Sequence, residues 1–330
     1  MLKSSFIRLV AICAILMLVA CQSDSPTQKK LSVVTAIYPQ YDWLKNILGE
    51  RCDSLNLELL VKNGMDLHSY NPSAKDIATI ANADMVVYVG GESDMWIEKA
   101  LEATPKAGRI EVNLMKALGD RVKEEEIVEG MQAEEEHHHE HGEEHEHAEE
   151  VENDEHVWLS LKNAEILVMT LAEAISKQDT AHASEYRMNA ALYIAKISAL
   201  DAQYRTAVDE ATHKTILFGD RFPFRYLVDD YGIKYYAAFV GCSAESEASF
   251  ETVAFLAGKM DSLQLPAIFT IDGSDGKIAR AILEASKQSK EAQVLTLNSM
   301  QSMTDAQAQA GTDYLSIMQA NLEILKKGLK

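Results

Sequence analysis

The stretch LSVVTAIYPQYDWLKNIL, residues 31–48, places a strand directly before a helix. Its first half, residues 31–39, is rich in β-branched and other apolar side chains, as is typical of a buried strand. Residues 41–48 then carry apolar side chains at helical spacing, and the pattern ends at Gly49. A strand that leads straight into a helix is the unit of α/β folds, so this stretch predicts such a fold.

The same alternation continues along the first half of the chain. Strands are predicted at 55–61, 85–89 and 109–113, and helices at 73–82 and 93–103. Strands that alternate with helices form mainly parallel sheets with helices on both faces. Ligands of such sheets usually lie beyond the carboxyl ends of the strands, so the polar loops there are the first places to look for a site.

A long helix separates the two halves. Residues 161–176 are predicted to be a helix, and a much longer one extends from 181 to about 211. The alternation then restarts, over 214–218, 226–231, 234–239, 250–263, 267–271, 275–288, 294–297 and 311–327. We expect an α/β fold of two lobes, each with a mainly parallel sheet, joined by one long spine helix. The predicted ranges are 31–176 for the N-terminal lobe, 177–212 for the spine helix and 213–330 for the C-terminal lobe.

The first 30 residues have the pattern of an export signal. A short apolar run follows two basic residues and ends at LVAC, residues 18–21, which is typical of a signal peptide with a lipid-attachment cysteine. We expect residues 1–20 to be removed, Cys21 to carry the lipid and residues 21–30 to form a tether. An uncleaved anchor helix is the alternative, but the run is shorter than the about 20 apolar residues of a membrane span. The mature protein is then lipid-anchored in the cell envelope and faces the periplasm or the cell exterior.

Negative charge is concentrated in one segment. The chain of 330 residues has a formal net charge of -20, which argues against nucleic acid as a partner because phosphates require a basic face. Residues 123–155 are dominated by Glu and His and lack apolar periodicity, so we expect an acidic, His-rich mobile loop. Neutral imidazoles beside carboxylates can bind borderline metals, and the alternative is a solvated loop with incidental histidines. Six histidines lie in this loop: His137, His138, His139, His141, His145 and His147.

The other four histidines fall into two groups. His182 and His213 lie in or beside the long helix, where a packing or surface role is the simpler interpretation. His68 and His156 each lie in a polar turn, at the kind of loop position where an α/β lobe places ligands. These two are therefore candidate metal ligands.

Two cysteines, Cys52 and Cys242, follow the lipid-attachment site. An oxidising compartment permits a disulfide between them, but their separation in sequence does not give their distance in space. Otherwise they are buried thiols, or Cys242 reaches the metal.

Several motifs together resemble one family. In order and spacing, from about residue 31 to 300, they are similar to those of the zinc and manganese solute-binding proteins of ABC transporters. The resemblance implies two α/β lobes joined by a rigid helix, with a metal held at the lobe interface by His68 and His156. Many zinc-type members carry an acidic, His-rich loop before the second of these histidines, as residues 134–147 do here. The motifs are Tyr38-Pro39 with Asp42, DLHSYNP at 66–72 followed by Asp76, ADMVVY at 83–88 with Glu92 and Trp96, and EHVWL at 155–159.

The second half departs from the family's pattern. The family usually has a histidine, or a glutamate in manganese-type members, ten residues before a Tyr-Gly pair, which is Tyr231-Gly232 here. That position is Arg221 in this chain. A guanidinium stays protonated and has no lone pair for a metal, so another residue must be the third ligand. A late acidic ligand of some members falls near Asn298, an amide that binds metals more weakly than a carboxylate does.

The third ligand is therefore open. Asp220 is the first candidate because it is adjacent to the family's ligand position, and a salt bridge with Arg221 or another local base is its structural alternative. Asp272, Glu245 and Cys242 are the next candidates.

The donor set favours zinc. Two imidazoles and a carboxylate suit Zn²⁺ and also accept Mn²⁺ or Fe²⁺, while the His-rich loop favours zinc. Because an imidazole must be neutral to bind a metal, we expect the affinity to fall below about pH 6.5.

The predicted function is that of an extracytoplasmic substrate-binding lipoprotein that captures a divalent metal for an ABC importer. Its expected partners are the transporter's permease and, through Cys21, a membrane, and the protein is expected to be a monomer. No enzyme is expected, since the chain has no nucleophile elbow, HExxH helix or P-loop. The alternatives are a metal-storage or adhesin lipoprotein without a transport role and a metallohydrolase built on His68, His156 and Asp220.

Overall fold

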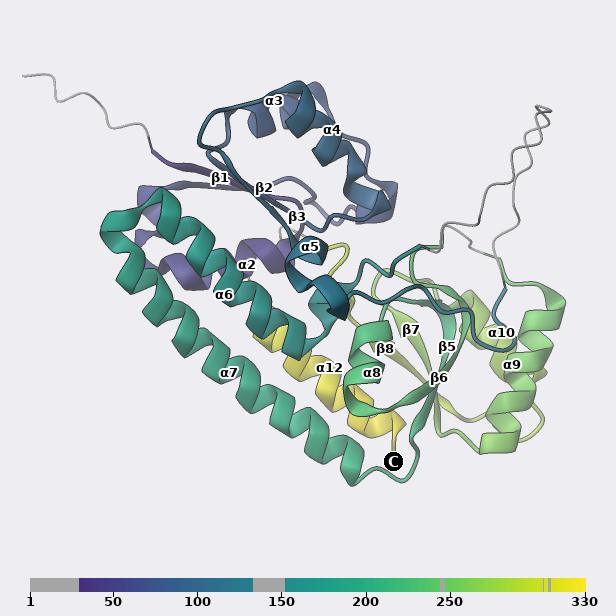
Figure 1. Ribbon diagram of the computed structural model, residues 1–330. Coiled ribbons are helices and arrows are strands. Elements are labelled where there is room, and N and C mark those ends of the chain that lie inside the picture. The colour runs from purple at the N-terminus through teal and green to yellow at the C-terminus, as the bar shows by residue number, and fades with distance from the viewer. Residues whose placement is uncertain (1–29, 133–151, 244–246, 305, 308–309) are drawn as a thin grey trace, which may run out of the picture. The chain divides into compact units, whose positions relative to one another are not determined.

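Two four-stranded parallel sheets organise the chain (Figure 1). They belong to a computed structural model that describes residues 30–132, 152–243, 247–304, 306–307 and 310–330. The expected signal peptide, nearly all of the tether, the six loop histidines and Glu245 lie outside the described residues. The predicted α/β fold with two mainly parallel sheets is confirmed.

The first sheet has the strand order β2-β1-β3-β4, and all neighbouring strands are parallel. All four residues of β3 are buried, as expected of a parallel strand covered on both faces. Its strands are β1 (Ser32–Thr35), β2 (Asn56–Leu59), β3 (Met85–Tyr88) and β4 (Ile110–Asn113). The helices between and after them are α2 (Tyr38–Leu48), α3 (Ala74–Asn82), α4 (Met95–Ala103) and α5 (Leu114–Leu118).

The second sheet repeats this design with the order β6-β5-β7-β8, again parallel throughout. The stretch 226–231 of the restarted alternation belongs to a helix, α8. The strands are β5 (Thr215–Phe222), β6 (Lys234–Val240), β7 (Ala267–Ile271) and β8 (Gln293–Leu297). The helices are α8 (Arg225–Tyr231), α9 (Phe250–Leu263), α10 (Lys277–Ala285) and α12 (Tyr314–Gly328).

Strand β5 is longer than the predicted 214–218. Its register against β6 shifts between Phe218 and Arg221, which marks an irregularity of the β-bulge type. A Cβ atom on Gly219 would lie 2.5 Å from the Cα atom of Ala279, so only glycine lets α10 pack this closely. The extension places Asp220 and Arg221 inside the strand.

Two long helices, α6 (Leu161–Gln178) and α7 (Ala183–Asp209), pack against each other (Figure 1). The Tyr193 hydroxyl on α7 donates to Asp42 of α2 at 3.1 Å. Eleven residues later, the Tyr204 hydroxyl donates to the carbonyl of Met318 of α12 at 2.6 Å. The 27-residue helix α7 therefore bonds to helices of both halves of the chain.

The described residues from Ser32 to Lys330 form one compact unit. The lobe and spine boundaries at residues 176 and 212 therefore stay a prediction. Among the described helices, none is long and apolar enough to cross a membrane.

Candidate metal centre

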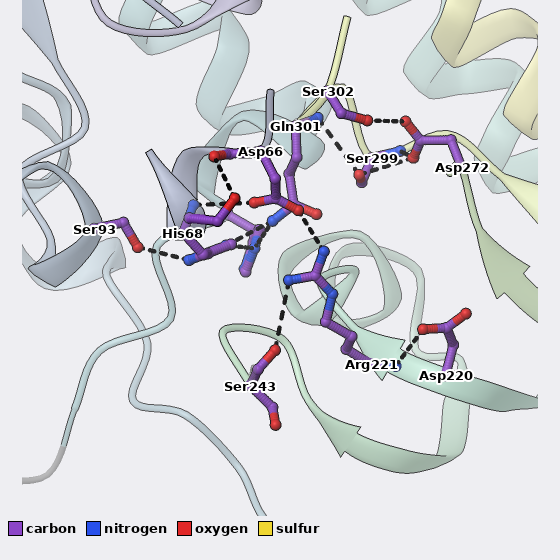
Figure 2. A network of polar contacts seen from close by, with 12 residues as sticks. Asp66, His68, Ser93, Asp220, Arg221, Ser243, Asp272, Ser299, Gln301 and Ser302 are labelled. Atoms are coloured by element: carbon purple, nitrogen blue, oxygen red, sulfur yellow. Dashed lines mark hydrogen bonds and ion pairs between the residues drawn. The ribbon is translucent and has the colours of Figure 1, made fainter. Parts of the chain in front are cut away.

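His68 lies on a short 3-10 helix, Leu67–Ser69, after β2. The side chain of Asp66 caps this turn, because its Oδ1 atom accepts a hydrogen bond from the backbone N–H of His68 at 3.0 Å. The Nδ1 atom of His68 lies 2.6 Å from the hydroxyl oxygen of Ser93 (Figure 2). This contact fits a proton on Nδ1, which leaves the lone pair of Nε2 available to a metal.

His156 is fully buried, on the segment that leads into α6. One carboxylate oxygen of Asp154 accepts from both the backbone N–H and the ring Nδ1 of His156, at 2.8 and 3.0 Å. A carboxylate oxygen only accepts, so Nδ1 carries the proton and Nε2 has a free lone pair. The arrangement of carboxylate, histidine and open Nε2 is the one that orients histidine ligands in metal sites.

The two imidazoles meet at their Nε2 atoms, which are 3.1 Å apart. The side-chain amide of Gln301 completes a triangle with them, since its Nε2 atom lies 2.6 Å from His68 Nε2 and 2.7 Å from His156 Nε2. Gln301 is 3% exposed, and its Oε1 atom has no hydrogen-bond partner among the described residues. A half-turn of the amide exchanges its nitrogen and oxygen, after which two nitrogens and one oxygen point at the same spot.

Gln301 was not among the residues that the sequence indicated. It lies in the loop after β8, three residues beyond Asn298, where a late ligand was considered. Asn298 instead has a structural role, because its Oδ1 atom accepts from the backbone N–H of Met300 and its own N–H donates to Asn321. The signal that could have found Gln301 is a polar side chain in an otherwise serine-rich and methionine-rich loop after a strand.

Asp272 supports the loop that carries Gln301. One of its carboxylate oxygens accepts from the backbone N–H and the hydroxyl of Ser299, at 2.6 and 2.9 Å, and the other accepts from the Ser302 hydroxyl at 3.3 Å (Figure 2). These bonds engage both oxygens of the carboxylate. The structure therefore gives Asp272 a role in positioning the loop.

Asp220 and Arg221 are neighbours on strand β5 and diverge (Figure 2). Both residues lie at the register shift of this strand, where the regular alternation of side chains is interrupted. Asp220 accepts a hydrogen bond from the backbone of Arg221 and, together with Asp272, lines a cavity of about 440 Å³. The alternative for Asp220, a salt bridge with Arg221, is absent from the described contacts, and the guanidinium pairs with Asp66 instead.

The ion pair of Asp66 and Arg221 joins the turn of His68 to strand β5. Although burial works in the other direction, the Arg221 charge holds the pKa of Asp66 below its usual range. Asp66 therefore stays ionised and offsets the positive charge that Arg221 brings close to the two histidines.

Burial and, second, the neighbouring His156 ring lower the pKa of His68 to about 3. At neutral pH the His68 imidazole is consequently neutral, as a metal ligand must be.

Among the described histidines, cysteines and carboxylates, one group could hold a metal ion: His68, His156 and Cys242, whose donor atoms all lie within 4.8 Å of one another. The structure does not bring Asp220 or Asp272 into this group. Cys52 and Cys242 are both free thiols, so the expected alternative of a disulfide between them is wrong.

Comparison with known proteins points to metal uptake. Residues 33–328 match a family model described as "Zinc-uptake complex component A periplasmic". The zinc-binding lipoprotein AdcA of Streptococcus pneumoniae is 34% identical over 328 residues, which cover 99% of this chain and 61% of AdcA. The chain thus spans about three fifths of the length of the AdcA relatives. The high-affinity zinc uptake system protein ZnuA of Bacillus subtilis is 32% identical over 328 residues, with 97% of each chain covered.

Solved structures have the same fold. The Zn(II)-bound ZnuA-like domain of Streptococcus pneumoniae AdcA matches with a TM-score of 0.69 at 28% identity, over 91% of this chain and 99% of that domain. The metal-dependent lipoprotein YcdH of Bacillus subtilis matches with a TM-score of 0.71 at 27% identity, over 91% and 99% of the two chains.

Proposed function

Since the chain belongs to the family of periplasmic A components of zinc-uptake complexes, we propose that it is an extracytoplasmic solute-binding protein that captures one zinc ion for an ABC importer. The observation that carries this proposal is the convergence of His68 Nε2, His156 Nε2 and the Gln301 amide on one point. Each histidine is oriented through its other ring nitrogen.

Zinc is the cargo of this protein and not a catalytic group. The site has two imidazoles and an amide, a donor set that fits Zn²⁺ and also accepts Mn²⁺ or Fe²⁺. Among the relatives, AdcA is described as a zinc-binding lipoprotein and ZnuA as a zinc uptake protein, which supports zinc as the metal that this chain binds. The protein is thus a carrier and not an enzyme.

Transport follows in three steps. The acidic loop around residues 137–147 raises the local concentration of zinc, and His68 and His156 then take a single ion. The loaded protein docks on the permease. The lipid on Cys21 holds the protein at the membrane, where it acts as a monomer on the periplasmic or outer face.

The alternative of a storage or adhesin lipoprotein differs in where the zinc is held. We expect a variant lacking residues 133–151 to retain one tight zinc site, because the described donors lie outside that segment. A competition titration with a chromophoric chelator measures it. Residues 123–132 are kept in this variant because they are hydrogen-bonded to the rest of the chain. The backbone N–H of Gln132 donates to the carbonyl of Ala238, and that of Glu125 donates to the carbonyl of Glu152. A loss of all tight binding on this deletion would favour storage by the loop.

The low pKa of His68 predicts how the stability of the metal-free protein depends on pH. Unfolding releases this imidazole to an ordinary pKa near 6.5, so the unfolded state binds more protons below that pH. The stability that the neutral imidazole contributes is present above pH 6.5 and is lost as the pH falls toward 3. We expect a loss of about 2 kcal/mol between pH 6.5 and pH 5, at 1.36 kcal/mol per pH unit.

Urea unfolding of chelator-treated protein at pH 7, 6 and 5 measures this slope. His68→Gln is the matched variant because its side chain does not titrate, and the steeper decline of the parent should disappear in it. Equal slopes in the two proteins would contradict the burial argument. At His68 itself, the low pKa means that protons compete with the metal only in much stronger acid.

A further inference from the structure

Cys242 lies in the turn after β6, beside the two histidines. Its sulfur lies within 4.8 Å of one ring nitrogen of each histidine. Around a tetrahedral zinc ion, two nitrogens and a sulfur lie about 3.3–3.6 Å apart, given Zn–N near 2.0–2.1 Å and Zn–S near 2.3 Å. A shift of about 1 Å therefore brings the sulfur to bonding distance of an ion held by the histidines.

The turn is built to approach His156 closely. A Cβ atom on Gly241 would lie 2.9 Å from His156 Cε1 and 2.9 Å from the carbonyl oxygen of Phe222. The absence of a side chain at residue 241 thus lets the backbone before Cys242 lie against the imidazole. On the other side, the Arg221 guanidinium reaches the carbonyl oxygen of Ser243 at 3.5 Å (Figure 2).

Gln301 independently indicates that a ligand belongs here. Its side chain is 3% exposed, and its Oε1 atom is buried without a partner although the amide touches both histidines. A buried amide oxygen without a partner is costly, and after a half-turn of the amide this oxygen faces the two histidine nitrogens, where a metal ion satisfies it.

From this geometry we propose that Cys242 is the third protein ligand of the metal, so that the site consists of two imidazoles, one thiolate and the Gln301 amide oxygen. The proposal rests on the proposed function, and it deepens that function by naming the donor that replaces the family's third ligand at Arg221. Arg221 then supports the turn next to Cys242 and does not bind the ion.

The binding of zinc to Cys242 releases one proton, and this proton has an acceptor nearby. The carboxylate of Glu125 lies close to the thiol of Cys242. When Zn²⁺ binds, the S–H bond breaks, a Zn–S bond forms, and the proton passes to Glu125 and on to water. A thiolate is a soft donor, so the site should select zinc, cadmium or cobalt over manganese, which prefers oxygen ligands.

Cobalt(II) tests the proposal because a thiolate bound to it gives an intense charge-transfer absorption in the near ultraviolet, while imidazole, carboxylate and amide ligands do not. We expect the purified full chain with one equivalent of Co²⁺ to show this band. Cys242→Ser and Cys242→Ala should lose it, and Cys52→Ser, the matched control at the other described cysteine, should keep it. Zinc affinity should fall roughly 100-fold in Cys242→Ser, while manganese affinity changes less than tenfold.

The outcomes separate this inference from the proposed function. One tightly bound cobalt ion without the near-ultraviolet band in the unaltered chain would overturn the thiolate ligand and leave capture by His68 and His156 intact. A band that survives in Cys242→Ser would likewise overturn the thiolate ligand and leave capture by the two histidines intact. A chain that binds no zinc or cobalt tightly would overturn both proposals.

Discussion

Replacing His156 with alanine is expected to weaken zinc binding roughly 100-fold, and replacing His68 as well should abolish the tight site. Zinc sites with four protein ligands bind with about 10–16 kcal/mol, so each ligand accounts for about 3 kcal/mol, or two orders of magnitude. His156 is fully buried, and the Asp154 carboxylate orients its ring. Because water cannot easily replace a buried ligand, the effect should be close to this estimate. Competition titration of the variants lacking residues 133–151 measures it.

His182→Ala is the matched control. The Nδ1 atom of this histidine lies 2.7 Å from a carboxylate oxygen of Asp179. The residue lies on the turn before α7, outside the group of metal donors. Its removal should leave the zinc affinity unchanged. If His156→Ala bound zinc as tightly as His182→Ala does, the imidazole of His156 would not be a ligand.

Trp158→Ala is expected to lower the free energy of unfolding by about 3–5 kcal/mol, as large-to-small changes at buried tryptophans do. Trp158 is fully buried and its ring lies against His156, with centroids 5.3 Å apart. Its indole N–H donates to the carbonyl oxygen of Ser299 at 2.8 Å, in the loop that carries Gln301. The substitution therefore leaves a cavity and an unpaired carbonyl, and it loosens two parts of the metal site together.

Urea unfolding in the presence of a chelator measures the change without a contribution from bound zinc. Trp96→Ala is the control, since Trp96 is partly exposed, its ring lies tilted against that of Tyr70, and its indole N–H has no hydrogen-bond partner among the described residues. We expect a clearly smaller loss there. Equal losses at the two positions would mean that Trp158 does not connect the segments as described.

Local patterns were enough to predict most of the fold. The run from Ser32 to Thr35 and the helix after it are adjacent in sequence, so periodicity alone identifies them. The length of β5 was missed because Gly219 and the polar residues after it interrupt the apolar pattern. Pairing with β6 across a shifted register, which is a tertiary effect, extends this strand to Phe222.

The metal centre, too, could be predicted only in part from the sequence. His68 and His156 could be named because each lies in a motif that resembles a family's. Gln301 could not, since it reaches the histidines from 233 and 145 residues away, and only the folded chain brings the amide to them. Asp220 was preferred because it is next to the expected position, but its carboxylate accepts from the backbone of Arg221, and the Arg221 side chain is the one that reaches Asp66.

A crystal structure of the zinc-loaded protein, with anomalous scattering recorded on both sides of the zinc absorption edge, tests the central claim most directly. The account predicts one strong zinc peak about 2.0–2.1 Å from the Nε2 atoms of both His68 and His156. A zinc peak in the cavity beside Asp220 and Asp272, with none between the two histidines, would contradict it.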